Sequence, residues 1–198
     1  TTSLTPQIVR AIHARHQAMH IRLRSANLDE CFTLLLSRQV DIAIVYRLPG
    51  EDHPISQSFV ETVTIGADRL VPVFAATETS GLNAQFAAGE LPVISYPPEV
   101  FLGQVLDRMI VPQLHHQTRP VPKAETALTL AALELALVGV GVAWVPLSLA
   151  RQRIAEGQLV DLSTTLPSCA LEVTAVRLFG APSPVADSVW SEILRSGS

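Results

Sequence analysis

The chain has 198 residues, of which 48% are hydrophobic and 16% charged, and its formal net charge is −4. This composition fits a folded domain with a sizeable core and excludes a disordered chain. The 14 lysines and arginines form no cluster, which argues against nucleic-acid binding by this chain itself.

The first quarter of the chain predicts two helices and two strands. Apolar residues at helical spacing indicate a helix over residues 6–17, and alternation over 21–24 indicates a strand. Asn27 is expected to cap a second helix that ends near Arg38, with Glu30 as its capping-box partner. The apolar run 41–46 predicts a strand of a parallel sheet that is covered on both faces.

The middle of the chain alternates between strands and helices. Two strands are expected over 59–65 and 70–75, separated by residues 66–68. A short helix over 82–88, a strand over 91–95, a helix over 100–113 and a strand over 121–124 follow.

The stretch from 126 to 162 carries the clearest pattern. Residues 127–138 are apolar on nearly every face, which predicts a helix buried on more than one side. Gly139 and Gly141 end it, a buried strand over 142–145 follows, and a helix over 148–156 leads to another strand. A late strand over 171–178 and a terminal helix over 184–194 complete the chain.

Repetition of strand, helix and strand predicts an α/β fold of two Rossmann-like lobes. The late segment has no partner helix in the second lobe, so it is expected to return to the first. This gives lobe I as 1–73 plus 174–198 and lobe II as 74–173, joined by two crossing strands. Ligands of such folds bind at the carboxyl ends of strands and in the crevice between lobes.

At this point the chain resembles the effector-binding domain of LysR-type transcriptional regulators. Four stretches carry the resemblance: Leu4-Thr5-Pro6 with the following helix, 34–44 with its Val-Asp-Ile-Ala-Ile, 139–146 with its Gly-x-Gly-x-x-x-x-Pro, and the helix 184–194. The string Gly141 to Pro146, followed by Gly157 to Val160, is similar to the hypochlorite-responsive branch of the family.

The resemblance implies a type 2 periplasmic-binding-protein-like fold with a small effector between the lobes. It also implies a cytoplasmic homodimer, a tetramer for the full-length protein, and DNA contact only through an N-terminal winged helix-turn-helix that this chain lacks. No cofactor is implied.

Family position also implies the effector-binding residues, most of which lie at strand-to-helix turns. Free N–H groups at such turns favour anions. The candidates are Thr2, Ser3, Ser25, Asn27, Tyr46 and Arg47 in the first lobe and Tyr96, Pro97, Phe101, Thr126, Val145 and Pro146 in the second.

Each candidate also has an ordinary structural explanation. Asn27 and Thr126 can be helix caps, and Arg47 can pair with a ligand carboxylate or lie solvated in a loop. Together the residues suit a small, partly apolar effector better than a sugar.

Redox and metal chemistry receive weaker support from the sequence. Cys31, one turn into a helix, is a redox candidate, but a small buried hydrophobic residue is the commoner role. His13, His16 and His20 share a helical spacing without matching carboxylates or cysteines, so no metal site is predicted.

The remaining functional classes lack the residues they need. No nucleophile–base motif or phosphate-binding loop is present, so no enzyme is predicted. The longest apolar run is too short to span a membrane. Two cysteines form no disulfide framework and favour a reducing compartment. Besides redox sensing through Cys31, the alternative function is a solute-binding protein of a transporter.

Overall fold

The chain folds into two α/β units. The computed structural model describes residues 5–15, 19–51, 59–114, 118–180 and 184–196. Unit 1 comprises Thr1–Asp68 and Ala170–Ser198, and unit 2 comprises Arg69–Cys169. The chain passes between them within β2 (Val60–Ala75) and at the start of β7 (Cys169–Leu178). The predicted boundaries, 73/74 and 173/174, lie a few residues further along the same two strands.

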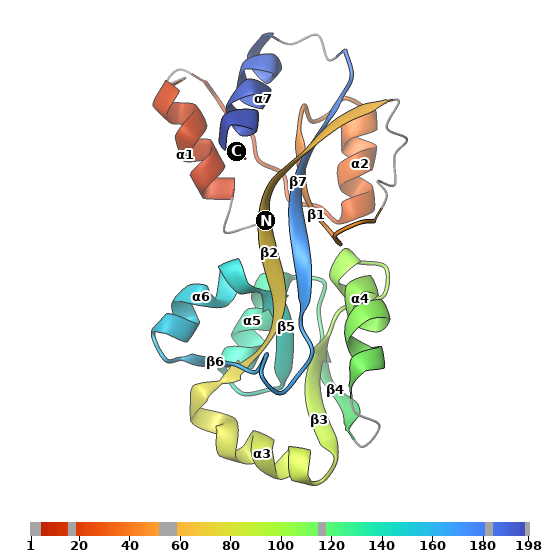
Figure 1. Ribbon diagram of the computed structural model, residues 1–198, viewed down its shortest axis with the longest axis vertical. Coiled ribbons are helices and arrows are strands. Elements are labelled where there is room, and N and C mark those ends of the chain that lie inside the picture. The colour runs from red at the N-terminus through yellow and green to blue at the C-terminus, as the bar shows by residue number, and fades with distance from the viewer. Residues whose placement is uncertain (1–4, 16–18, 52–58, 115–117, 181–183, 197–198) are drawn as a thin grey trace. The chain divides into compact units, whose positions relative to one another are not determined.

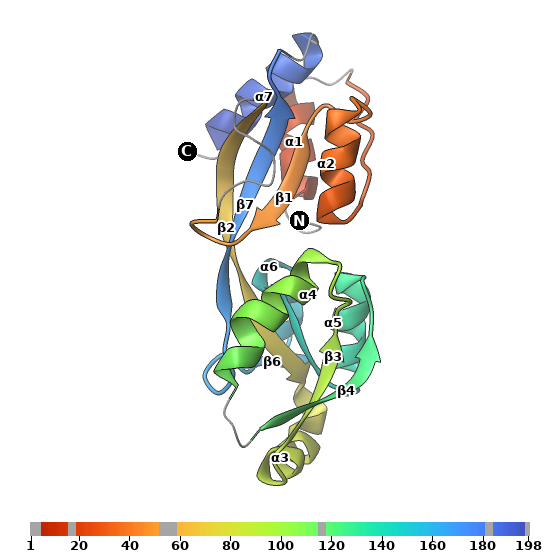
Figure 2. The ribbon, with the colours of Figure 1, turned by 90° about the vertical axis from the view of Figure 1, so that its right-hand side faces the viewer.

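Unit 1 is a sheet between two helical layers. Its strands run in the order β1 (Ala43–Arg47), β7 and β2, and β1 is antiparallel to β7. Helix α2 (Leu28–Leu36) lies on one side of these strands, and α1 (Thr5–Arg15) and α7 (Pro184–Ser196) lie on the other (Figures 1 and 2). The α2 side buries Phe32, Leu35, Val45 and Val176, and the α7 side buries Ala175, Trp190 and Ile193.

Unit 2 is built around a parallel core. Strand β3 (Glu90–Ser95) is parallel to both β4 (Arg119–Glu125) and β5 (Val142–Pro146). The end of β2 is antiparallel to β5 and to β6 (Leu159–Asp161). All five residues of β5 are buried, as expected for a strand covered on both faces.

Helices cover both faces of this second sheet. Helix α4 (Phe101–Val105) lies on one side of the strands, and α5 (Thr129–Leu137) and α6 (Leu147–Ala155) lie on the other (Figure 1). Helix α4 continues as a π-helical turn over Leu106–Ile110 and a 3-10 turn over Val111–Gln113, so the predicted helix 100–113 is one helical stretch. A 3-10 turn over Ala76–Glu78 leads into α3 (Thr79–Ala87).

The glycine turn after α5 forms as the sequence predicts. Gly139 has φ +76° and donates its N–H to the Ala136 carbonyl at 3.1 Å, which ends the helix. A Cβ on Gly141 would lie 3.2 Å from the backbone of Pro92, so the absence of a side chain lets β5 approach β3.

Four predictions of local structure are wrong. Residues 21–24 form no strand, because in the described chain no neighbouring strand pairs with them. Strand β1 is antiparallel to its neighbour and not part of a parallel sheet. Residues 66–68 do not separate two strands, since β2 runs through them without a break. Helix α5 is not buried on more than one side, because Leu130 is 53% exposed and Val138, at its end, is 71% exposed.

Candidate functional site

Arg47 lies at the carboxyl end of β1, on the face of the unit 1 sheet that α2 covers. The β1–β7 register pairs Val45 with Thr174 and Arg47 with Glu172, so these four residues share one face. The guanidinium Nη2 of Arg47 donates to the backbone carbonyl of Glu51. Its Nε is buried and has no hydrogen-bond partner among the described residues.

Thr174 presents a second buried polar atom on the same face. The residue is 1% exposed, and its hydroxyl has no hydrogen-bond partner in the described part of the chain. Thr174 is the diagonal neighbour of Arg47 across the strand pair, a relation that places Cα atoms roughly 7–8 Å apart. Leaving one buried polar group unpaired costs about 1–3 kcal/mol, so these two atoms mark a place where a ligand or water can bind.

Three other predicted residues of unit 1 already have structural roles or lie apart. The side-chain oxygen of Asn27 accepts from the Glu30 N–H at 2.8 Å, which confirms the predicted cap of α2. The Tyr46 hydroxyl donates to Asp68 at 2.8 Å, and strand alternation places Tyr46 on the face opposite Arg47. Ser25 is exposed in an irregular segment, and Thr2 and Ser3 lie outside the described residues.

In unit 2 the structure brings three predicted positions to one edge. Tyr96, Thr126 and Pro146 stand at the carboxyl ends of β3, β4 and β5, which are parallel neighbours. The Thr126 N–H donates to the Ser95 carbonyl at 3.0 Å, which joins the ends of β3 and β4. This is the edge at which ligands of α/β sheets bind.

The side chains at this edge are mostly engaged or buried. Tyr96 is buried, and its hydroxyl donates to the Trp144 carbonyl at 3.0 Å. Burial raises the pKa of Tyr96, while a hydrogen bond with Thr129 opposes the shift, so the phenol stays neutral. The Thr126 hydroxyl accepts from the Leu128 N–H at 3.1 Å. Leu128 is the N-cap of α5, so Thr126 lies two residues before the cap and is not the N-cap itself.

The apolar candidates of unit 2 differ in exposure. Val145 and Pro146 are buried in β5 opposite Val71 and Leu70 of β2. Pro97 and Phe101 are half-buried, and Phe101 begins α4. Ligand contact by these residues stays a prediction.

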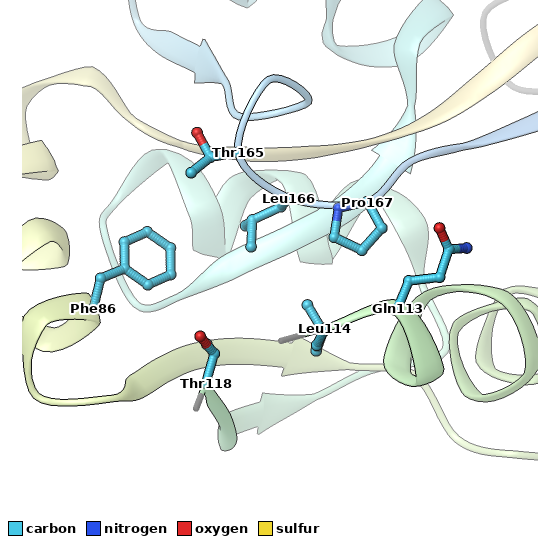
Figure 3. A pocket seen from close by; sticks show the side chains of 7 residues that line it. All are labelled: Phe86, Gln113, Leu114, Thr118, Thr165, Leu166 and Pro167. Atoms are coloured by element: carbon cyan, nitrogen blue, oxygen red, sulfur yellow. The ribbon is translucent and has the colours of Figure 1, made fainter. Parts of the chain in front are cut away.

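A separate cavity of about 430 Å³ lies in unit 2, away from that edge. Figure 3 shows Phe86 at one end and Gln113 at the other, with Leu166 and Pro167 between them. Thr118 directly precedes β4 and Phe86 precedes β3, so the cavity lies at the amino ends of these strands. Sequence reasoning missed it, because its lining comes from four separate segments without a motif.

The surroundings of Cys31 disfavour the thiolate form of its side chain. Burial, and secondarily the carboxylate of Glu30, raise the pKa of the Cys31 thiol. The thiolate is the reactive form, so a raised pKa lowers reactivity at neutral pH. Cys31 is half-buried and lines a groove of unit 1 whose walls mix apolar residues of α1 and α7 with polar residues such as Arg22 and Asp41.

No group of three or more metal-ligating residues occurs in the part of the chain that the structure describes. Of the predicted histidine set, His13 lies in α1, His20 is exposed, and His16 is outside the described residues. Within the same limits, no helix combines the length and apolar character that crossing a membrane requires.

Comparison with known proteins decides the family. A family model described as the LysR substrate binding domain matches residues 1–198. The chain belongs to this LysR family. The predicted resemblance is therefore confirmed.

Relatives of this LysR-type domain are transcription regulators. The chain is 23% identical over 173 residues to the HTH domain-truncated transcriptional regulator QseD of Escherichia coli O157:H7, covering 86% of this chain and 68% of the relative. It is equally similar to the HTH-type transcriptional regulator YjiE of Escherichia coli K12, covering 86% of this chain and 54% of that protein. The chain thus spans about half to two thirds of these proteins.

Solved structures confirm the two-lobed fold. The regulatory domain of HypT from Salmonella typhimurium matches with a TM-score of 0.78 and 20% identity, covering 99% of this chain and 90% of that chain. HypT is described as a hypochlorite-specific LysR-type transcriptional regulator. At this identity the likeness establishes the fold and leaves the effector of the LysR-type domain to be determined.

Proposed function

We propose that this chain is the effector-sensing domain of a bacterial LysR-type transcription regulator and that its effector is a small molecule bearing a carboxylate or another hydrogen-bond acceptor. The observation that carries the proposal is a pair of buried polar atoms, Arg47 Nε and Thr174 Oγ1, which have no hydrogen-bond partner among the described residues and lie on one sheet face near the carboxyl end of β1.

The chemistry of these two groups defines the ligand. A guanidinium N–H donates to carboxylates and carbonyls, and a threonine hydroxyl both donates and accepts. Asp29 and Glu30 in the first turn of α2 disfavour a multiply charged anion at this end of the sheet. A monocarboxylate or a neutral acceptor therefore fits best. That the effector binds between the two lobes, and that it contacts the candidate residues of unit 2, stays a prediction.

Family membership favours a regulator over the alternatives. The matched relatives are transcription regulators, whereas the solute-binding protein of a transporter would be expected to resemble other solute-binding proteins. We therefore propose cytoplasmic action, with DNA contacted through a separate domain. The raised pKa of Cys31 argues against oxidation of this thiol as the signal.

We also propose that the domain acts as a homodimer. Helix α5 and its ends expose Leu128, Leu130 and Val138, which are 69%, 53% and 71% exposed. Large apolar side chains gathered on one helix are typical of a protein–protein interface.

The effector proposal is tested by ligand binding to substituted chains. A thermal-shift screen of small monocarboxylates and their neutral amides identifies binders, and calorimetry measures their affinity for wild type, Arg47→Ala and Thr174→Val. We expect Arg47→Ala to weaken a carboxylate at least ~10-fold and Thr174→Val to weaken it several-fold. Thr174→Val should also raise the ligand-free melting temperature, because it removes an unpaired buried hydroxyl.

The exposed Arg151 of α6 supplies a matched control. Arg151→Ala removes the same charge and should leave binding unchanged. Binders that retain full affinity in both Arg47→Ala and Thr174→Val would disprove the proposed site.

A further inference from the structure

The cavity at the amino ends of β3 and β4 has the size of a small-molecule site. All of its described lining residues belong to unit 2, and its volume of about 430 Å³ lies within the range of ligand pockets, ~300–1,000 Å³. The unit 2 candidates Tyr96, Thr126 and Pro146 lie at the other ends of the parallel strands, and none of these three lines the cavity.

The lining defines an uncharged ligand. Among the described residues the walls combine an aromatic ring, aliphatic side chains, two hydroxyls and an amide, and none carries a charge: Phe86, Leu114, Leu166, Pro167, Thr118, Thr165 and Gln113. An ion entering this site loses hydration without gaining a charged partner from the described lining residues. A neutral molecule with a largely apolar surface loses little hydration free energy on entering the cavity.

The two ends of the cavity differ in chemistry. Figure 3 shows the Phe86 ring at one end and the Gln113 amide at the other. The Gln113 Nε2 donates to the Met109 carbonyl, which leaves the amide oxygen as the group that can accept from a ligand. An elongated molecule with an aromatic or alkyl end and a hydroxyl or amide N–H at the other end matches this polarity.

One wall of the cavity is held in place by hydrogen bonds. The Leu166 N–H donates to the Leu162 carbonyl at 2.8 Å, and the Leu162 N–H donates to the Pro72 carbonyl at 2.9 Å. The indole N–H of Trp144 donates to the Pro167 carbonyl at 2.8 Å. A wall fixed before binding reduces the ordering cost that a ligand must offset.

Trp144 connects this wall to the opposite end of the sheet. It is 2% exposed in β5, and its backbone carbonyl accepts the Tyr96 hydroxyl at 3.0 Å. Tyr96 follows the carboxyl end of β3. A ligand in contact with Pro167 is therefore linked through Trp144 to a residue at the effector edge.

We propose that this cavity binds a small, uncharged, largely apolar molecule with one hydrogen-bond donor, as a regulatory site separate from the effector site. The proposal does not depend on Arg47 or Thr174, and it calls for an uncharged ligand instead of a carboxylate.

The probes are 2-phenylethanol and phenylacetate, which share a phenyl ring and differ in charge. Binding to the 198-residue chain is measured by calorimetry and by ligand-observed NMR. We expect 2-phenylethanol to bind saturably at millimolar concentration and phenylacetate to bind this cavity at least ~10-fold more weakly. Arg47→Ala serves as the background in which phenylacetate is titrated, so that the proposed effector site does not contribute.

Two adjacent threonines provide a matched pair of variants. Thr165 lines the cavity, whereas Thr164 is an exposed neighbour that does not. Thr165→Phe should fill the cavity and weaken 2-phenylethanol at least ~10-fold, while Thr164→Phe should bind it like wild type. Circular dichroism checks that both variants fold.

The proposal is overturned by any of three results. These are no saturable binding of 2-phenylethanol up to about 10 mM, equal affinity in Thr165→Phe and Thr164→Phe, or equal affinity for phenylacetate in the Arg47→Ala background. Loss of carboxylate binding in Arg47→Ala with retained 2-phenylethanol binding would support two separate sites, so the effector proposal and this one can fail independently.

Discussion

Arg177 on β7 connects a strand, a helix and an aromatic ring in unit 1. Its guanidinium lies 2.7 Å from Glu61 on β2 and 2.7 Å from Asp187 on α7. It also lies 4.8 Å from the ring centroid of Trp190, whose indole N–H donates to Glu61 at 3.0 Å. Because Arg177 and Glu61 are only 17% and 35% exposed, this network is shielded from solvent more than an ordinary surface ion pair.

Replacing Arg177 should therefore loosen α7 from the sheet. We expect Arg177→Met to lower the free energy of unfolding by about 2 kcal/mol, because Glu61 is left partly buried without its cation. Urea denaturation measures the change. Arg153→Met is the control, since Arg153 meets Glu134 at 3.9 Å on an exposed surface and should contribute less than ~0.5 kcal/mol. Equal losses in the two variants would contradict the assigned role.

For single residues, the sequence predicts where a residue lies in the fold better than it predicts which groups its side chain contacts. The family resemblance implies Tyr96, Thr126 and Pro146 as candidates at the ends of strands, and in the structure they lie at the carboxyl ends of β3, β4 and β5. It does not reveal that the Tyr96 hydroxyl is bonded to Trp144, or that Thr174, 127 residues after Arg47, joins it on one face. Such pairings depend on long-range register, which local residue patterns do not encode.

Glycines at the ends of helices determine how unit 2 turns from helix to strand. Gly139 adopts φ +76° after α5, a conformation that costs other L-residues about 1–2 kcal/mol. By contrast, Gly81 lies within α3, without a positive φ, and a Cβ there would meet nothing within 4 Å. The same residue type is thus required at one position and dispensable at the other.

Alanine substitutions should separate these two roles. We expect Gly139→Ala to lower the free energy of unfolding by about 1 kcal/mol, through left-handed strain and crowding against the Glu78 side chain. Gly81→Ala should raise it by roughly 0.5–1 kcal/mol, because alanine loses less backbone entropy in a helix. Urea unfolding of both variants gives the comparison, and a destabilised Gly81→Ala would show that α3 packing has been misassigned.

Helices and strands of this fold were predictable where the local sequence pattern agrees with the packing that the rest of the fold provides. Strand β5 is apolar in sequence and buried in the structure. Gly139 follows α5 with a positive φ, the conformation that a glycine at the end of a helix commonly adopts. Residues 21–24 alternate like a strand but find no pairing partner in the described chain. Gly66 resembles a turn residue, yet the extended backbone runs through it. In both cases the outcome depends on neighbouring strands and not on the segment itself.

On the scale of the whole molecule, the apolar residues of α5 connect sequence, fold and assembly. The sequence of α5 predicted burial on more than one side, but its buried residues, Ala132, Leu133 and Ala136, share a single side. Leu130 and Val138 remain exposed, eight residues apart and therefore on the same side of the helix. A helix that is apolar beyond its core-facing side is explained if a second copy of the domain covers the remainder.

Charge placed on this side of α5 should weaken the homodimer. We expect Leu130→Glu to raise the dimer dissociation constant at least ~10-fold, because a carboxylate buried in an apolar interface loses hydration without a partner. Sedimentation velocity over a concentration series measures the constant. Leu36→Glu is a matched control, since Leu36 is also 53% exposed but lies on α2 of unit 1. Val138→Glu should act like Leu130→Glu. A domain that is monomeric throughout, or one in which Leu36→Glu dissociates the dimer as strongly as Leu130→Glu, would place the interface elsewhere and leave the apolar side of α5 to another partner.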